Sequence, residues 1–361
     1  MQRHVHATHT PLMSMKTAAL LVAAGVAQAL SLAWPFEGAF KGEAQGWLQC
    51  LSLAVLAFKL DRSKSGLQAF ASTWVFALAW LAGSIWWLFI SMHRYGGLPA
   101  PIAALAVGLM AAGLAFFYAG GAWVYHVAAR AGVGVLPRAS AFAAVCTLAE
   151  MTRGTLWTGF PWGAVGYAHI DSLLQHWAPW VGVYGLCAVS AFVAMAAAAE
   201  RQASRPASRA TQFLVIVLLA ALGYTWFTSP SRSANAPPLS AQPLSITLLQ
   251  GNIPQDLKFG EGVNLALRDY RDALMSSSSD LTVTPETAIP LIQQQMPERY
   301  WGQLEAHFSK GTKAALIGLP LATRSAQGQL QYSNSAVALM PQATPASTAS
   351  YQYDKHHLVP F

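Results

Sequence analysis

The stretch S-D-L-T-V-T-P-E-T-A-I-P, residues 279–290, decides how the last third of this sequence folds. Apolar and polar residues alternate around Leu281 and Val283, which predicts a short β-strand. Because proline cannot donate to a strand ladder, the strand is expected to end before Pro285 and to present Glu286 just beyond its end. One carboxylate delivered by a strand end is a candidate catalytic group.

Short β-rich runs alternate with polar helical runs on both sides of this stretch, which predicts an α/β layered domain. The first of these strands is expected to be buried, and Pro297 falls in the first turn of the second helix. The expected strands are residues 244–253, 281–284, 314–320, 332–340 and a fifth from 350, and the expected helices are 262–275 and 297–309.

The sequence before residue 230 has the composition of a membrane domain. Charged residues make up 10% of the whole chain, against about a quarter in ordinary soluble proteins. Acidic residues are scarce in this part and become common after it. Seven apolar runs approach the length that crosses a bilayer. They are residues 17–34, 45–60, 68–91, 99–129, 139–153, 172–199 and 211–228.

These runs define four segments: a cytoplasmic tail (1–16), a seven-span transmembrane domain (17–228), a Pro- and Ser-rich linker (229–243) and a soluble domain (244–361). With the N-terminus inside, the basic residues of the cytoplasmic segments number ten and those of the opposite side three, which is the asymmetry expected for cytoplasmic loops. The soluble domain then lies on the outer side of the membrane. The net charge of +7 comes from these loops and has no basic stripe with interleaved aromatics, so nucleic acid is not an expected partner.

Two residues of opposite charge and a group of aromatics mark the loop after the fifth run. Glu150 and Arg153 stand three apart on one helical face, where they are expected to form an ion pair. The aromatic residues are typical of a membrane interface, and we expect them to face lipid or to line the floor of a lipid-facing site, although an anchored loop would carry the same pattern. They are Trp157, Phe160, Trp162 and Tyr167.

Cysteine and histidine suggest no metal site. Cys50, Cys146 and Cys187 all lie in apolar runs and are expected to be small packing residues. His356 and His357 are neighbours on a predicted strand, where adjacent side chains point to opposite faces. Neither a metal nor another cofactor is expected.

Five segments in order resemble the apolipoprotein N-acyltransferase family, and the resemblance covers nearly the whole chain. They are T-G-F-P-W with the following G-Y (Thr158–Trp162, Gly166, Tyr167), Q-G-N-I-P-Q (Gln250–Gln255), T-P-E-T-A-I-P (Thr284–Pro290), Y-S-N-S (Tyr332–Ser335) and D-K-H-H-L-V-P-F (Asp354–Phe361). The family implies a periplasmic αββα sandwich like that of nitrilases, carried by a polytopic helical membrane domain. Phe259 stands where the family has tryptophan, and we expect it to face the substrate lipid.

The resemblance implies a catalytic set of Glu, Lys and Cys. Glu286 matches the general base, and we expect a partly apolar pocket to raise its pKa. Lys355 matches the group that stabilises the oxyanion. No cysteine matches the nucleophile, so the sequence is interpreted as the N-terminal part of a longer protein, inactive alone and with apolar sheet faces exposed.

The implied reaction moves an acyl chain from a membrane phospholipid, through a Cys thioester, to the α-amine of a diacylglyceryl apolipoprotein. Both partners belong to the lipid bilayer. Two alternatives stay open on the sequence alone. One is a membrane-tethered amidase of the nitrilase type, and the other is a non-catalytic protein that binds lipid.

Overall fold

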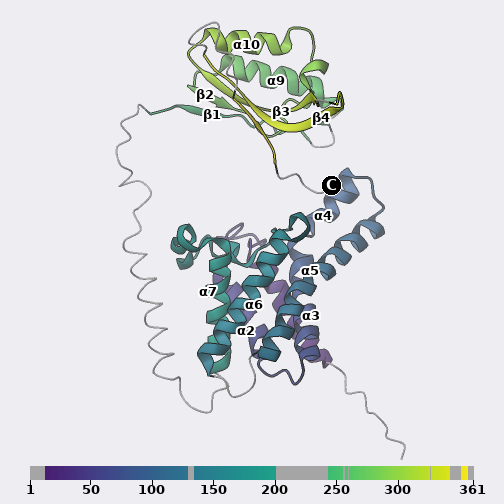
Figure 1. Cartoon of the computed structure of the whole chain (residues 1–361), viewed down its shortest axis with the longest axis vertical. Coiled ribbons are helices and arrows are strands. Elements are labelled where there is room, and N and C mark those ends of the chain that lie inside the picture. Colours follow the sequence, from purple (N-terminus) through teal and green to yellow (C-terminus); the bar gives the residue numbers. More distant parts are fainter. Residues whose placement is uncertain are drawn as a thin grey trace, which may run out of the picture. The chain divides into compact units, whose positions relative to one another are not determined.

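The computed structural model describes residues 13–128, 134–200, 243–254, 257–258, 260–325, 327–341 and 351–356 (Figure 1). The chain divides into two compact units, residues 1–235 and 236–361, which are described separately below. The division falls inside the predicted linker of residues 229–243, most of which lies outside the described residues, as does the predicted span 211–228.

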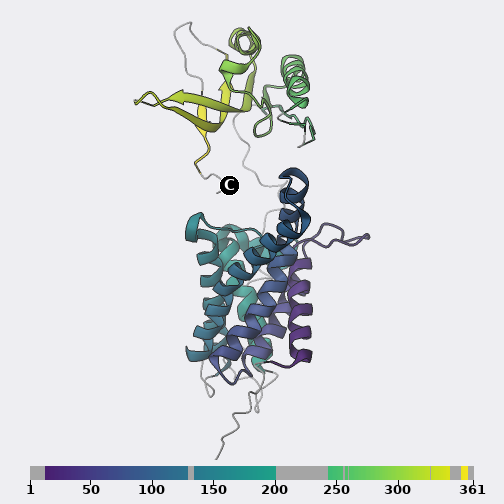
Figure 2. The ribbon, with the colours of Figure 1, turned by 90° about the vertical axis from the view of Figure 1, so that its right-hand side faces the viewer.

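The first unit is a bundle of helices that lie side by side along one axis (Figure 2). α3 packs against α1 and α5, and α7 packs against α2 and α6. The side-chain oxygens of Ser14 and Ser65 cap α1 and α3 by accepting hydrogen bonds from the backbone N–H groups three residues later. The long helices are α1 (Met15–Leu30), α2 (Gly46–Leu60), α3 (Gly66–Ser84), α5 (Ala100–Ala128), α6 (Val135–Thr155) and α7 (Ala178–Glu200).

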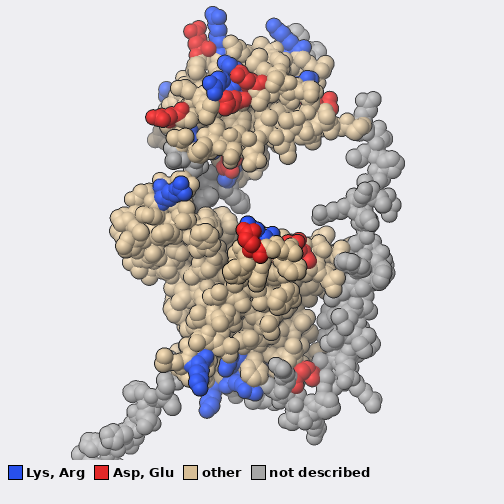
Figure 3. Space-filling view, turned by 180° about the vertical axis from the view of Figure 1, so that it is seen from behind, with Lys and Arg blue, Asp and Glu red and all other residues tan. Residues whose placement is uncertain are grey.

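These helices occupy six of the seven apolar runs, and the largest difference is in the third. The third run was expected to continue to residue 91, but α3 ends at Ser84. Residues after it form the short helix α4 (Trp87–Ile90) and the π-helical turn η1 (Ser91–Tyr95). Three helical segments are long and apolar enough to cross a membrane, namely Gly66–Ser84, Ala100–Ala128 and Leu173–Glu200. Charged side chains lie at the ends of the bundle, and its flank is almost free of them (Figure 3).

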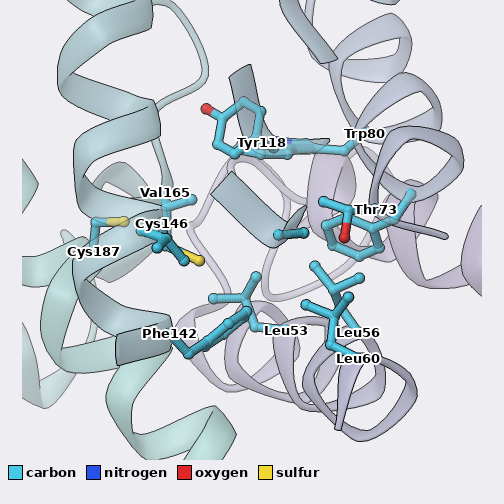
Figure 4. Close-up of a pocket in the computed structure, with 13 residues that line it drawn as sticks. Leu53, Leu56, Leu60, Thr73, Trp80, Tyr118, Phe142, Cys146, Val165 and Cys187 are labelled. Carbon is cyan, nitrogen blue, oxygen red and sulfur yellow. The ribbon is translucent and has the colours of Figure 1, made fainter. Parts of the chain in front are cut away.

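The core of the bundle is made of buried apolar side chains from all the long helices. Trp80 and Phe76 of α3 are almost fully buried, and Phe142 of α6 packs edge-on to Tyr125 of α5. An apolar cavity lies among these helices, with Cys146 and Cys187 in its wall (Figure 4). Three short 3₁₀ turns connect α6 to α7. They are η2 (Leu156–Thr158), η3 (Val165–His169) and η4 (Leu173–Trp177).

The second unit is a five-stranded mixed sheet in the order β1-β2-β3-β4-β5. β1 pairs with β2 and β2 with β3 in parallel, whereas β3–β4 and β4–β5 are antiparallel. The strands are β1 (Ile246–Leu248), β2 (Leu281–Val283), β3 (Ala314–Arg324), β4 (Leu330–Leu339) and β5 (Gln352–Asp354). The helical segments are α9 (Gly262–Ser276), η5 (Gln293–Gln295) and α10 (Tyr300–Lys310).

α9 and α10 cover one face of this sheet. Leu274 of α9 and Phe308 of α10 belong to one buried cluster with Ile317 and Leu319 of β3. The opposite face is apolar but open among the described residues. Because side chains alternate along a strand, this face carries alternate residues of every strand. Its exposed members include Ile246, Leu248 and Tyr353.

The expectation of a buried first strand is therefore wrong. Ile246 is 54% exposed and Leu248 is 76% exposed. β1 stands at the edge of the sheet, and its apolar side chains point away from the face that α9 and α10 cover, because their neighbour Thr247 lies in register with Thr282 and Ala315 on the covered face. An apolar strand in the sequence indicates a surface that needs a partner, but not whether the partner is present.

Candidate active site

The turn that carries Glu286 is held against β3 by backbone and hydroxyl hydrogen bonds. The N–H of Thr284 donates to the carbonyl of Leu316 at 3.0 Å, and the N–H of Gly318 donates to the Thr284 hydroxyl at 3.0 Å. A Cβ on Gly318 would lie 2.3 Å from the carbonyl oxygen of Pro285, so only glycine lets the turn approach this closely. Thr287 has a φ of 51°, which turns the chain directly after Glu286.

The end of β5 brings a lysine to this turn. The N–H of Lys355 donates to the carbonyl of Asn334 on β4 at 2.9 Å. The Nζ of Lys355 then donates to Oε1 of Glu286 at 3.0 Å, although the two residues are 69 positions apart. The amide of Asn334 donates to the same carboxylate oxygen. The sheet thus brings together the two residues that the sequence singled out and adds Asn334 as a third.

The electrostatics of this pair correct the expectation of a raised pKa. The side chain of Glu286 is 62% exposed and that of Lys355 is 36% exposed, so the described residues form no apolar pocket around the carboxylate. The hydrogen bond from Lys355 lowers the pKa of Glu286, partial burial opposes this, and the Asn334 amide lowers it further. The net direction is downward, because two donors act on a carboxylate that water still reaches.

Asn334 is the residue of this site that sequence reasoning missed as a participant. It lies in the quoted Y-S-N-S segment, but nothing in that segment says which side chain points to the carboxylate. Lys258 also lies nearby, with its Nζ 3.5 Å from the carbonyl oxygen of Glu286. Phe259, the next residue and an expected lipid contact, is outside the described residues. Among the residues that are described, no group of His, Cys, Asp and Glu has the arrangement of a metal site.

The predicted Glu150–Arg153 pair in the first unit is confirmed. Arg153 donates to Oε2 of Glu150 at 3.1 Å, and both side chains are fully buried. Tyr118 of α5 joins the pair, because its hydroxyl donates to Oε1 of Glu150 and accepts from Nε of Arg153 at 2.9 Å. Arg153 also donates to the carbonyl oxygens of Phe160 and Trp162, at 2.6 and 2.8 Å. The guanidinium therefore fastens the loop after α6 to the core of the bundle.

Three of the four aromatics expected to face lipid are on the surface of this loop. Trp157 is 85% exposed, Trp162 43% and Tyr167 48%. For Phe160 the expectation is wrong, because its ring is only 8% exposed and packs into the core of the bundle. The backbone carbonyl of Phe160 accepts a hydrogen bond from Arg153. Trp157 and Thr158 both have positive φ, a conformation that costs free energy in residues with a Cβ.

In the sequence, the three cysteines lie far from Glu286 and Lys355 of the second unit. Cys50, Cys146 and Cys187 are free thiols in α2, α6 and α7 of the bundle. Figure 4 shows the last two at the cavity among apolar side chains such as Leu53 and Phe142. The second unit, residues 236–361, contains no cysteine in its sequence.

Comparison with known proteins agrees with the arrangement of these segments. The family profile described as "Apolipoprotein N-acyltransferase N-terminal domain" matches residues 24–199. Apolipoprotein N-acyltransferase of Verminephrobacter eiseniae is 45% identical over 94% of this chain and 62% of its own length. The protein of that name from Ralstonia nicotianae is 41% identical over 87% of this chain and 58% of its own.

The relative of the same name from Bordetella bronchiseptica is 34% identical over 95% of this chain and 66% of its own length. The chain thus spans less than two thirds of the length of these relatives. The matches nevertheless run through both units, from the helical bundle into the sheet that carries Glu286 and Lys355. The chain belongs to the apolipoprotein N-acyltransferase family.

Proposed function

We propose that this chain serves the transfer of an acyl chain from a phospholipid to the α-amine of a diacylglyceryl apolipoprotein. The observation that carries the proposal is the 3.0 Å contact between Lys355 and Glu286, made by residues from distant segments that the sheet brings together. A carboxylate with a cation at this distance suits a step that moves a proton while negative charge develops on a carbonyl oxygen.

Glu286 acts in this proposal as the proton acceptor. Lys355 keeps it ionised at rest, because the hydrogen bond from Nζ lowers its pKa. When a tetrahedral intermediate forms, Lys355 turns its N–H groups to the oxyanion and leaves the carboxylate. The pKa of Glu286 then rises, since its first stabilising partner has gone, and the carboxylate becomes a better base during the step that needs one.

The acyl chain is carried on a cysteine thiol, as the family resemblance implies, and the second unit supplies no such thiol. In the first half-reaction the S–H proton passes to Glu286, a sulfur–acyl bond forms and the glycerol ester bond breaks. The glycerol oxygen takes the proton and leaves as a lysophospholipid. In the second half, the lipoprotein amine forms an amide with the acyl carbon, the thioester breaks, and the amine proton returns to sulfur through Glu286.

The wider architecture belongs to the same proposal. The helical bundle is a multi-pass domain of the bacterial inner membrane with its N-terminus in the cytoplasm, and the sheet is part of a periplasmic αββα sandwich. The open apolar face with Ile246, Leu248 and Tyr353 supports a sandwich, because a second sheet packs against such a face. The exposed rings of Trp157, Trp162 and Tyr167 support lipid contact, because they suit a membrane interface.

The test is an assay of the protein, as its gene encodes it, in vesicles that contain a phospholipid with a labelled acyl chain and a synthetic diacylglyceryl-cysteine lipopeptide. We expect the label to appear in an amide on the lipopeptide and Glu286→Gln to abolish its transfer. Glu298→Gln is a matched control, because Glu298 is exposed and forms an ion pair with its neighbour Arg299. A polypeptide that ends at Phe361 is expected to form no thioester, for want of a thiol in the second unit.

Two outcomes would replace the proposal with its alternatives. Release of free labelled fatty acid without any amide product would show that water is the acceptor, as in a membrane-tethered amidase of the nitrilase type. Retention of lipid and lipopeptide by the protein with no turnover would show a non-catalytic lipid-binding protein.

A further inference from the structure

The loop between α1 and α2 is closed into a rigid projection. The N–H of Gln45 donates to the carbonyl of Ser31 at 2.8 Å, which closes the base of the loop. The N–H of Gly42 donates to the carbonyl of Trp34 at 2.8 Å, and the N–H of Trp34 donates to the carbonyl of Glu43 at 2.9 Å. We call residues 34–43 the finger. In Figure 2 it extends sideways from one end of the bundle.

The tip of the finger presents aromatic rings that the rest of the described chain does not cover. Phe36 is 55% exposed and Phe40 is 59% exposed. The ring of Trp34 meets that of Phe36 edge-on, with centroids 5.1 Å apart, and so supports it from the base. Lys41 and Glu37 pair with each other across one turn. The tip therefore combines two exposed rings with a neutralised pair of charges.

The finger leaves the bundle at the end where exposed aromatics gather. Its base is joined to the loop after α6, since the N–H of Ala44 donates to Asp171 at 2.9 Å and His169 contacts Gln49 at 3.0 Å. Burial of His169 lowers its pKa to about 4, so its imidazole is neutral near pH 7. Other exposed tryptophans lie in the loops or helix ends at this level: Trp47, Trp86, Trp157 and Trp180.

The outward side of α1, the helix that leads into the finger, is apolar. Leu20, Val22 and Val26 of α1 are all more than 40% exposed. A line of aliphatic side chains that ends in aromatic ones is the pattern of a helix passing from the acyl region into the headgroup region of a bilayer. The finger begins where this line ends and turns away from the bundle axis (Figure 2).

We propose that the finger is an interfacial anchor, with Phe36 and Phe40 inserted among the lipids of the leaflet at this end of the bundle. Its partner is a lipid surface rather than a protein, because the exposed side chains of α1 beside it are aliphatic and the flank of the bundle in Figure 3 is nearly free of charge. The closed backbone bonds lower the cost of placing peptide groups near hydrocarbon. A contact outside the perimeter of the bundle resists tilting and sets the depth of the helices.

The proposal is tested by the environment of one label at the tip. Ala39→Cys, at the tip between the two rings, is labelled with a polarity-sensitive dye through a water-soluble maleimide. The wild-type chain, with its three cysteines in the bundle, gives the background. In phospholipid vesicles we expect blue-shifted emission, strong quenching by lipids that carry a nitroxide near the headgroup, and several-fold weaker quenching by aqueous iodide than for a label at Lys64→Cys, in a polar loop at the other end of the bundle.

Paired variants identify what holds the tip in the lipid. Phe36→Ser with Phe40→Ser is expected to raise iodide quenching at residue 39 to the level of the Lys64→Cys label. Glu37→Gln with Lys41→Gln keeps both rings and is expected to leave the label protected. The idea is overturned if the label at residue 39 is as open to iodide as the control label, if the serine variants leave its environment unchanged, or if protection appears only when a soluble protein is added. None of these readouts depends on acyl transfer.

Discussion

The Glu150–Arg153 pair of the bundle and the Glu286–Lys355 pair of the sheet have nearly the same length, at 3.1 and 3.0 Å, but opposite surroundings. The first pair is fully buried, whereas the carboxylate of the second is 62% exposed. In the bundle, Tyr118 and two backbone carbonyls use the hydrogen-bonding groups that remain. In the sheet, one oxygen of Glu286 takes both donors and the other has no protein donor among the described residues.

This difference separates a structural ion pair from one that can do chemistry. Moving charged groups out of water costs free energy, and a buried ion pair is stable only when further hydrogen bonds use its remaining donors and acceptors. The remaining donors of Arg153 are used by Tyr118 and by two backbone carbonyls. Such a pair cannot release a partner without leaving a charge unpaired. Lys355 can leave Glu286, because water replaces it at little cost. Only the second pair is therefore suited to proton transfer.

The largest effect is expected from Arg153→Met. The change leaves the Glu150 carboxylate buried without its cation and frees the carbonyls of Phe160 and Trp162. We expect a loss of about 3–5 kcal/mol in stability, the usual cost of breaking a buried pair from one side. Thermal unfolding of the protein in detergent micelles, followed by circular dichroism, measures it.

The double variant Glu150→Gln with Arg153→Met is the control for charge. It removes both charges, so we expect it to be more stable than Arg153→Met alone, even though the loop carbonyls remain free. If the double variant were equally unstable, the loss would come from the loop contacts and not from the buried charge, and the contrast between the two pairs would not hold.

Glu286→Gln is expected to separate activity from stability. Acyl transfer should fall by about 10²–10⁴, the usual contribution of a general base. The free energy of unfolding should change by less than about 1 kcal/mol, because an exposed pair contributes little. Turnover of the labelled phospholipid and urea unfolding are compared on the same preparation. A change of several kcal/mol would place this pair in the same class as Glu150–Arg153.

Lys355→Met is expected to change the pH dependence of Glu286. Lys355 is the first cause of its lowered pKa, so the variant should bring the value back up toward the ordinary 4.5. Any stability that the Glu286–Lys355 pair contributes is present above pH 4.5, the ordinary pKa of the carboxyl. It is lost as the pH falls through the lower pKa that Glu286 has in the folded protein. The pKa is measured by NMR titration of the side-chain carboxyl of Glu286 in a selectively labelled protein. Asn334→Ala should shift it in the same direction by less, and no shift in either variant would contradict the assigned causes.

The smallest effect is expected at the turn that Arg153 fastens. Thr158 has a φ of 74°, which residues with a Cβ adopt only at a cost. Thr158→Gly removes this strain and should raise the stability of the bundle by up to about 1 kcal/mol. Differential scanning fluorimetry in micelles checks the sign. Thr155→Gly is the matched control, because that residue is within α6 and should lose stability instead.

The sequence allowed much of the fold to be predicted, because hydrophobic periodicity and length determine local structure directly. The α/β alternation predicted the five strands and two helices, and the apolar runs predicted the six long helices described in the bundle. The pairing of Glu150 with Arg153 followed from helical spacing. The exposure of β1 did not follow from the sequence, because an apolar strand has the same sequence whether or not a second layer covers it.

The sequence predicted two residues of the site but not the surroundings of their side chains. Glu286 and Lys355 were found through short motifs, and the lowered pKa, the exposed carboxylate and the role of Asn334 were not. A pKa depends on which donors reach an oxygen and on how much water remains, and both follow from the register of β4 with β5. Likewise, Phe160 and Trp162 are near neighbours in one aromatic segment and both of their carbonyls bind Arg153, but only the ring of Phe160 packs into the core.

By itself the sequence determined the class of each segment: apolar helices in the first unit, alternating strands and helices in the second, and the identity of the chemical groups. These properties are local, since they depend on residues within a few turns or one strand. The tertiary structure alone decided which further groups join these pairs, how much water surrounds them and which way the aromatic rings point. Those properties depend on contacts between residues far apart in the chain, such as the 69 positions that separate Glu286 from Lys355.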